Sequence, residues 1–67
     1  MSIEPTDEMD LLLTVEQAAR RLKVGRTTVY ALIASGALES VTIGRLRRIP
    51  ADALPKYVTS LRSLAAA

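Results

Sequence analysis

Residues 13–38 of the chain read LTVEQAARRLKVGRTTVYALIASGAL, and two helical patterns follow one another in this stretch. The first begins at Thr14, a good N-cap residue, and Gln17 three positions later completes a capping-box pattern. Glu16 lies in the first turn, where the helix dipole favours an anion. Small and apolar residues then recur with helical spacing and form one stripe: Val15, Ala18, Ala19 and Leu22. This pattern predicts a short helix over residues 15–22.

A second helical pattern starts after a break at residues 23–25, which are Lys, Val and Gly. Three residues with a Gly are typical of the turn in a helix-turn-helix pair. Gly25 either caps the second helix or takes a positive φ in the turn. We expect this helix over residues 26–35, with Gly36 at its C-terminal stop. Its core side consists of Val29, Leu32 and Ile33.

The opposite side of the second helix has no Glu or Lys, which is unusual for a helix at a protein surface. Its residues are small or carry a hydroxyl group: Thr27, Thr28, Tyr30, Ala31, Ala34 and Ser35. Such a face lets the helix backbone approach another surface closely, and the DNA major groove admits a helix of this kind, whereas acids there would be repelled by phosphate. The alternative is a face packed against another copy of the protein.

After the second helix the apolar period changes from 3.6 to 2, which indicates a β-hairpin. Residues 41–43 are β-formers, Gly44-Arg45 is a plausible two-residue turn, and residues 47–49 return as a second strand. Pairing across that turn places Arg48 among apolar side chains and leaves Ile49 on the opposite side. Either the loop is therefore longer than two residues or the return strand ends early.

A third helix is predicted after Pro50, which ends the hairpin. Its apolar residues recur with helical spacing: Leu54, Tyr57, Val58, Leu61 and Leu64. Pro55 is tolerated only in the first turn of a helix. Either residues 51–53 form a separate turn and the helix starts near Leu54, or Pro55 lies in its first turn. We expect residues 65–67 to fray.

The composition of the chain excludes several classes of function. There is no Cys and no His, so a disulfide framework and the commonest metal ligand and catalytic base are all missing. We therefore expect no enzyme, catalytic residue, metal, cofactor or small-molecule ligand; a Ser–Lys pair is the remaining catalytic option, and no pattern favours it. The longest apolar run, residues 11–13, is far too short to span a membrane, and no signal peptide is visible, so we expect a cytoplasmic protein.

The net charge of +2 combines two unlike parts of the chain. Residues 1–10 contain four acids and no base, and we expect them to form a flexible tail. Residues 11–67 contain nine bases and three acids, a net charge of +6, and residues 11–64 should form the folded domain. So much positive charge on a small body suggests a polyanion as partner, although many small domains are basic for solubility alone.

The bases concentrate where the helix pair and the hairpin are expected, because seven of the nine lie between Arg20 and Arg48. Arg45 at the hairpin tip and Arg47 beside it are placed to reach phosphates or a narrow minor groove. The alternative is that these arginines are solvated and protect an exposed sheet edge. Arg48 has the further option of packing its aliphatic stem on the core.

Together these landmarks resemble the excisionase-type winged helix-turn-helix family, which is related to the DNA-binding domains of MerR-like regulators. The resemblance runs from residue 13 to residue 54 and includes VTIGRLRRIPADAL at residues 41–54. It implies a mainly α fold with a small two-stranded antiparallel wing, in the order helix, turn, helix, wing, helix. In this family the second helix enters the major groove, and the wing contacts the adjacent minor groove or its phosphates.

The resemblance, taken together with the positions of the bases and of the small residues, predicts which residues bind DNA. Those of the recognition helix are Arg26, Thr27, Thr28, Tyr30 and Ala31, and those of the wing are Arg45, Arg47 and Arg48. Supporting phosphate contacts fall on Thr14, Arg20, Arg21 and Lys23. The chain departs from the family at three places: Gly25 stands where a Ser usually caps the helix, Arg47 stands where an aromatic is common, and Pro55 interrupts a helix that is usually continuous.

The function implied by the resemblance is that of an excisionase, or recombination directionality factor. Such a factor binds and bends attachment-site DNA so that an integrase excises a phage or mobile element. The expected partners are double-stranded DNA, other copies bound side by side and an integrase, with no membrane involved. Two alternatives are a small transcriptional regulator of the same fold and an adaptor that binds a partner helix, and salt would weaken the adaptor's binding little.

Overall fold

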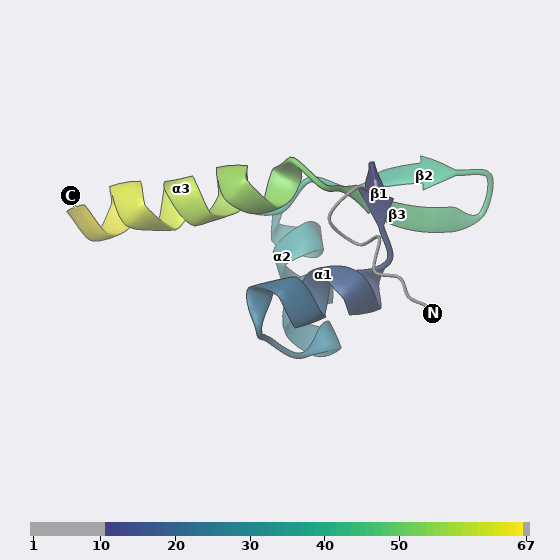
Figure 1. Ribbon diagram of the computed structural model, residues 1–67, viewed down its shortest axis with the longest axis horizontal. Coiled ribbons are helices and arrows are strands. Elements are labelled where there is room, and N and C mark those ends of the chain that lie inside the picture. The colour runs from purple at the N-terminus through teal and green to yellow at the C-terminus, as the bar shows by residue number, and fades with distance from the viewer. Residues whose placement is uncertain (1–10, 67) are drawn as a thin grey trace, which may run out of the picture.

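The computed structural model of the chain describes residues 11–66. Within these residues it has three helices and three short strands, in the order β1 (Leu12–Leu13), α1 (Val15–Leu22), α2 (Arg26–Ser35), β2 (Val41–Ile43), β3 (Leu46–Pro50) and α3 (Ala53–Ala66) (Figure 1). The expected flexible tail over residues 1–10 lies outside the described residues, as does Ala67.

Helix α1 begins with the capping box that the sequence predicts. The Thr14 hydroxyl oxygen accepts a hydrogen bond from the Gln17 backbone N–H at 3.0 Å, and the Thr14 backbone N–H donates to Gln17 Oε1 at 2.8 Å. These two bonds satisfy donors that the helix itself cannot pair. The predicted bounds of α1 and α2 are both confirmed.

In the turn between α1 and α2, one of our two expectations for Gly25 is confirmed and the other is wrong. Gly25 has φ −80° and is the N-cap of α2, so the capping alternative is confirmed. The positive φ of the turn, 62°, falls instead on Lys23, which ends α1 with its backbone N–H directed at the carbonyls of Ala19 and Arg20. At the other end of α2, Gly36 takes φ 85° as predicted for a C-terminal stop.

Strands β2 and β3 form the predicted antiparallel wing. Ile43 pairs with Leu46 across the two-residue turn Gly44-Arg45, and Val41 pairs with Arg48. The only positive φ of this turn is 61° at Gly44, its first central residue, which is the pattern of a type II′ hairpin.

Both of our alternatives for the wing are wrong, because its loop has two residues and β3 continues to Pro50. The register does place Arg48 on the same side as apolar residues. It does not bury Arg48 in the core, because Ile43 and Leu46 are on the solvent side of the hairpin and not on its core side. Arg48 shares that solvent side and is half-buried, whereas Ile49 points the other way and is fully buried.

A third strand, β1, is absent from the sequence prediction. It pairs antiparallel with the other edge of β3, so the sheet order is β1-β3-β2, with Leu13 opposite Ile49 and Leu12 opposite Pro50. The Ala51 backbone N–H extends this pairing by donating to the Leu11 carbonyl at 2.9 Å. The wing is therefore anchored to the segment that leads directly into α1.

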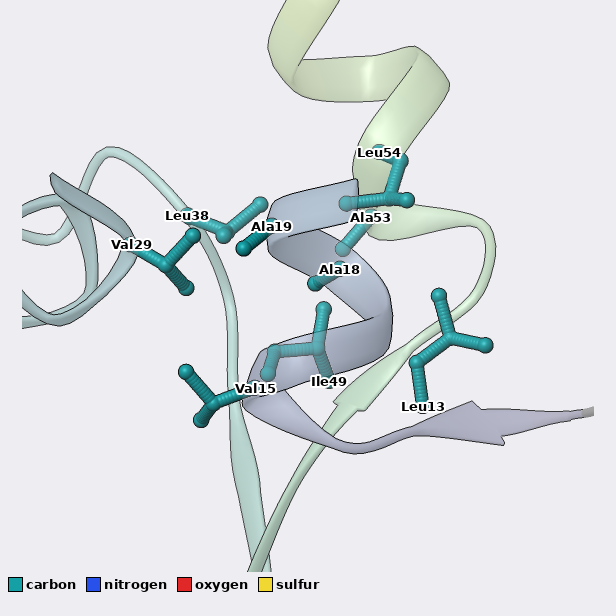
Figure 2. Close-up of a cluster of buried hydrophobic side chains, with 9 residues drawn as sticks. All are labelled: Leu13, Val15, Ala18, Ala19, Val29, Leu38, Ile49, Ala53 and Leu54. Carbon is teal, nitrogen blue, oxygen red and sulfur yellow. The ribbon is translucent and has the colours of Figure 1, made fainter. Parts of the chain in front are cut away.

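The core is small and made only of aliphatic side chains. Figure 2 shows them gathered around α1, and they come from α1 itself, from β1, α2, β3 and α3, and from the segment after α2: Leu13, Val15, Ala18, Ala19, Val29, Leu38, Ile49, Ala53 and Leu54. Among the described residues no polar or charged side chain is buried. Leu32, Ile33 and Tyr57 pack against the edge of this cluster.

Helix α3 follows a turn at residues 51–52 and carries Pro55 in its first turn, which confirms the second of our two alternatives. A proline there removes no helical hydrogen bond, because the first backbone N–H groups have no partner within the helix. Only the start of α3 packs on the body, and the rest extends away from it, at the opposite end of the molecule from the wing (Figure 1). The apolar residues Val58, Leu61 and Leu64 are consequently exposed.

Candidate nucleic-acid interface

The candidate interface is built on the outer face of α2, which we define as Thr27, Thr28, Tyr30, Ala31, Ala34 and Ser35. All six residues are exposed, while Val29 on the opposite side is fully buried. The face carries no charge, and its side chains are small except for Tyr30. It results from a helix whose core stripe is narrow, so that more than half of its circumference is in contact with solvent.

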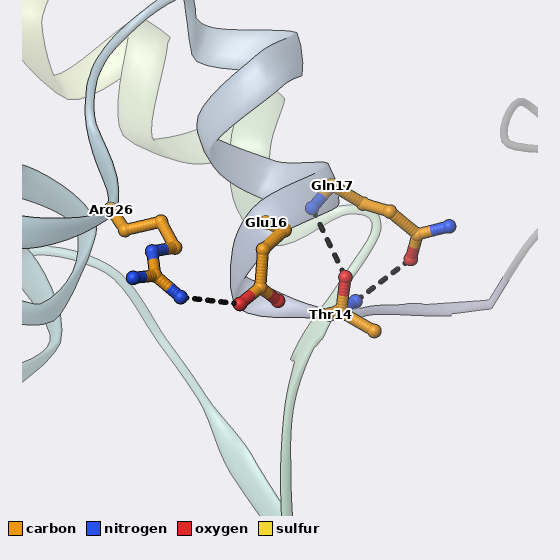
Figure 3. Close-up of polar contacts among 4 residues, drawn as sticks. All are labelled: Thr14, Glu16, Gln17 and Arg26. Atoms are coloured by element: carbon orange, nitrogen blue, oxygen red, sulfur yellow. Dashed lines mark hydrogen bonds and ion pairs between the residues drawn. The ribbon is translucent and has the colours of Figure 1, made fainter.

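Arg26, the first residue of α2 and its only base, is held by an acid from the other helix. Its Nη1 donates to Glu16 Oε2 at 3.0 Å, and the two side chains are 64% and 51% exposed (Figure 3). A hydrogen bond from the backbone amide of Glu16, the hydrogen bond from Arg26, and the charges of Arg26 and Arg20 hold the pKa of Glu16 below its ordinary value of 4.5. The carboxylate is therefore ionised at neutral pH.

The bases of α1 lie on two sides of that helix. Arg20 stands one turn after Glu16 and contributes to its electrostatic environment, so it belongs to the same cluster as Arg26. Arg21 is turned by about 100° from Arg20 around the helix axis and is not part of that cluster. Arg20, Arg21 and Lys23 are all exposed. The half-buried Thr14 has its hydroxyl oxygen engaged as the cap of α1.

The three wing arginines differ in their surroundings. Arg45 is exposed at the hairpin tip. Arg47 is also exposed, and its Nη1 donates to the Ser40 hydroxyl at 2.7 Å, while Arg48 Nη1 donates to the Arg47 carbonyl at 2.9 Å. Arg45 is thus the wing base that projects farthest from the folded body.

Two features of this surface escape the sequence prediction. One is the Glu16–Arg26 pair, which joins residues ten apart on different helices and leaves no periodic signal. The other is an apolar wing tip, where the cross-strand pair Ile43 and Leu46 is 56% and 54% exposed. The strand register places Ile43 and Leu46 on the same side of the hairpin. The sequence does not show that this side faces solvent.

Residues 11–66 show few features of a metal site, a membrane-spanning segment or a ligand pocket. No group of three or more His, Cys, Asp or Glu side chains comes together there. In the same part of the chain no helix is both long and apolar enough to cross a membrane. A pocket of about 180 Å³ is lined by Gly36, Lys56 and Tyr57 among others, at the end of α2 remote from Arg26.

Comparison with known proteins agrees with this geometry. The family described as "Helix-turn-helix domain" matches residues 12–62. The excisionase of Streptomyces ambofaciens is 47% identical to the chain over 47 residues, which are 70% of this chain and 76% of that protein. The chain belongs to the excisionase-type helix-turn-helix family. No solved structure matches it.

Two further relatives of this excisionase-type domain are longer than the chain. A probable excisionase of Saccharopolyspora erythraea is 61% identical over 51 residues, which cover 76% of the chain and 52% of that protein. The chain therefore spans about half the length of this relative. The uncharacterised protein YvgK of Bacillus subtilis is 41% identical over 49 residues, which cover 73% of the chain and 16% of that protein.

Proposed function

We propose that this chain is a DNA-binding excision factor that makes and breaks no bond itself. It binds attachment-site DNA of a phage or mobile element and bends it, which favours the integrase complex committed to excision. The observation that carries this proposal is the exposed, acid-free outer face of α2 in a fold that also has a wing with an exposed arginine at its tip. The names of two relatives, an excisionase and a probable excisionase, support the same role.

In this proposal α2 enters the major groove. That groove is about 12 Å wide and admits an α-helix of ordinary diameter. Thr27 and Ala31 lie at the centre of the outer face, so the backbone can approach the base edges, and a Thr can donate to a base or contact a thymine methyl group. Arg26, Thr28 and Tyr30 flank these two residues and complete the proposed base-contacting set.

The remaining bases position the protein on the duplex. Arg45 at the wing tip contacts the adjacent minor groove or its phosphates, with Arg47 and Arg48 behind it. Arg20, Arg21, Lys23 and the hydroxyl of Thr14 contact phosphates on the other side of α2. Contacts on both sides favour bent DNA, because bending costs a few kcal/mol that additional contacts must offset.

Several copies bind side by side on repeated sites, and α3 provides a surface for this. Val58 and Leu61 are exposed, and Leu64 is 74% exposed, so an apolar stripe runs along the part of α3 that leaves the body. Covering this stripe with a neighbouring copy removes apolar surface from water, which stabilises the assembly on DNA.

The proposed function is tested by footprinting and bending assays with the purified chain. The DNA is the region that flanks the encoding gene, and each assay is run with and without an integrase. We expect protection of repeated sites, a bend at these sites, and excision only when both proteins are present. Protection without any effect on excision would favour a transcriptional regulator, and binding insensitive to salt would favour the adaptor function.

The role of α3 is tested with Leu61→Gln, matched by Thr59→Gln on the opposite side of the same helix. Leu61→Gln should abolish cooperative occupancy of a fragment with several sites while leaving single-site affinity unchanged. Thr59→Gln should keep the cooperativity of the wild-type chain. Independent binding by the wild-type chain in a gel-shift series would contradict the side-by-side arrangement.

A further inference from the structure

Glu16 is an acid on the surface that faces DNA in the proposed function. Its carboxylate accepts a hydrogen bond from Arg26 Nη1 at 3.0 Å, at the point where the start of α1 meets the start of α2 (Figure 3). A negative charge there repels phosphate, so it weakens the attraction of the neighbouring bases for any DNA. An acid at this position therefore needs a compensating role.

The contribution of Glu16 to the stability of the free protein accounts for only a part of that role. Glu16 lies in the first turn of α1, where an anion is favourable, but Gln or Ser is also well tolerated at a helix start. The pair with Arg26 is exposed on both sides, and exposed ion pairs contribute little to stability. The pair also acts on the Arg26 side chain, because it favours the orientation in which Nη1 reaches Glu16.

Arg26 is a long side chain that can contact either a phosphate or a base edge. A free arginine would turn to the nearest phosphate, which contributes to affinity for every sequence and to specificity for none. The hydrogen bond from Nη1 to Glu16 favours one orientation of the guanidinium before DNA arrives, and its other N–H groups stay available. Ordering a side chain in advance reduces the entropy lost on binding.

We propose that Glu16 is a positioning residue that sets base specificity by holding Arg26 toward a base edge. The base is a guanine, because the fork of an arginine matches the O6 and N7 acceptors that guanine presents in the major groove. Arg20, one turn further along α1, balances the charge of Glu16. This assignment rests on the proposed function, since it requires that α2 contact DNA.

The test compares discrimination between two duplexes in variants of Glu16. One duplex is the best binder that the wild-type chain selects from a randomised library, and the other is a scrambled duplex of equal composition. Glu16→Gln should bind the scrambled duplex more tightly and lose about tenfold in the ratio of the two affinities. Glu16→Asp, which keeps the carboxylate, should recover part of that ratio.

A matched control separates charge from positioning. Glu39→Gln removes the same charge from another exposed position, beyond the end of α2. It should strengthen binding to both duplexes slightly and leave their ratio unchanged. Circular dichroism of each variant verifies that it is folded under the binding conditions, so that a loss of fold is not mistaken for a loss of specificity.

The decisive experiment places Glu16→Gln in an Arg26→Ala background. If Glu16 acts through Arg26, its substitution should not lower the affinity ratio any further in that background. An equal loss in both backgrounds overturns the assignment, as does a wild-type ratio in Glu16→Gln alone. A wild-type chain that shows no preference between the two duplexes overturns the proposed function, and the assignment with it.

Discussion

Single residues at the start of α1 hold the first helix of the pair in place. Thr14 and Gln17 exchange two hydrogen bonds there, at 3.0 and 2.8 Å, immediately before the buried stripe begins at Val15. Because the core is small, the free energy of unfolding should be low, and the loss of one cap should be a large fraction of it.

Thr14→Ala should lower the free energy of unfolding by about 1 kcal/mol, because the Gln17 backbone N–H loses its partner. Thr14→Ser keeps the hydroxyl and should stay close to the wild-type value. Urea unfolding followed by circular dichroism measures both. Equal loss in the two variants would show that the methyl group of Thr14, and not its hydroxyl, is responsible.

The acid dependence of stability should contain a contribution from Glu16. The folded state holds the pKa of Glu16 below its ordinary value of 4.5. The stabilisation is therefore complete above pH 4.5 and is lost as the pH falls through the lowered value. Thermal unfolding between neutral and acidic pH should show a smaller decrease for Glu16→Gln than for the wild-type chain.

Arg26→Ala is the informative companion to this measurement. It removes the side-chain hydrogen bond but leaves the backbone amide of Glu16, which is the largest cause of the lowered pKa. It should therefore reduce the acid dependence only in part. Identical acid profiles for Glu16→Gln and the wild-type chain would contradict the role of this carboxylate.

The elements of the chain differ in how firmly each is attached to the core. β3 is the most central, since it pairs with β1 on one edge and β2 on the other and contributes the buried Ile49. The wing tip beyond it has no buried side chain, because Thr42, Ile43 and Leu46 are all exposed. Substitutions at the tip should therefore alter DNA binding without unfolding the domain.

Arg45→Ala should weaken binding to all duplexes and reduce the slope of log K against log salt by about 0.9. The reason is that one phosphate contact releases about one counterion. Arg62→Ala, an exposed arginine on α3, is the matched control and should leave both values unchanged. Fluorescence anisotropy over a salt series measures the slope. An effect of Arg45→Ala on one sequence only would instead indicate a base contact.

At the scale of the whole molecule, shape and charge are both uneven. The described part of the chain extends over 44 × 26 × 19 Å, with α3 and the wing at opposite ends of the long axis (Figure 1). Four acids lie within residues 1–10, and nine bases lie in the remainder. An acidic segment joined to a basic surface competes with phosphate for that surface.

Deletion of residues 1–10 should tighten binding to non-cognate DNA, because it raises the net charge from +2 to +6. The increase should be greatest at low salt and fade as screening increases. A full-length variant in which the four acids become amides should behave like the deletion. If only the deletion has an effect, the length of the segment matters and its charge does not.

Local patterns predict much of the fold, and long-range pairing accounts for the parts that they miss. Helices α1 and α2 end at the predicted residues because their caps and apolar periods act within a few residues. Strand β1 is missed because two leucines carry no period, and they become a strand only when β3 lies beside them. The contact between Glu16 and Arg26 is missed for the same reason, because it forms only when the two helices are packed together.

The sequence by itself determined the helix pair, the two-residue turn at Gly44 and the positive charge that collects around them. All of these follow from interactions between neighbours in the chain. Only the tertiary structure decided which side of the wing faces solvent, that Arg26 is held by Glu16, and that the apolar stripe of α3 stays uncovered. Those features depend on residues from different elements, and burial is a property of the packed fold that no single segment contains.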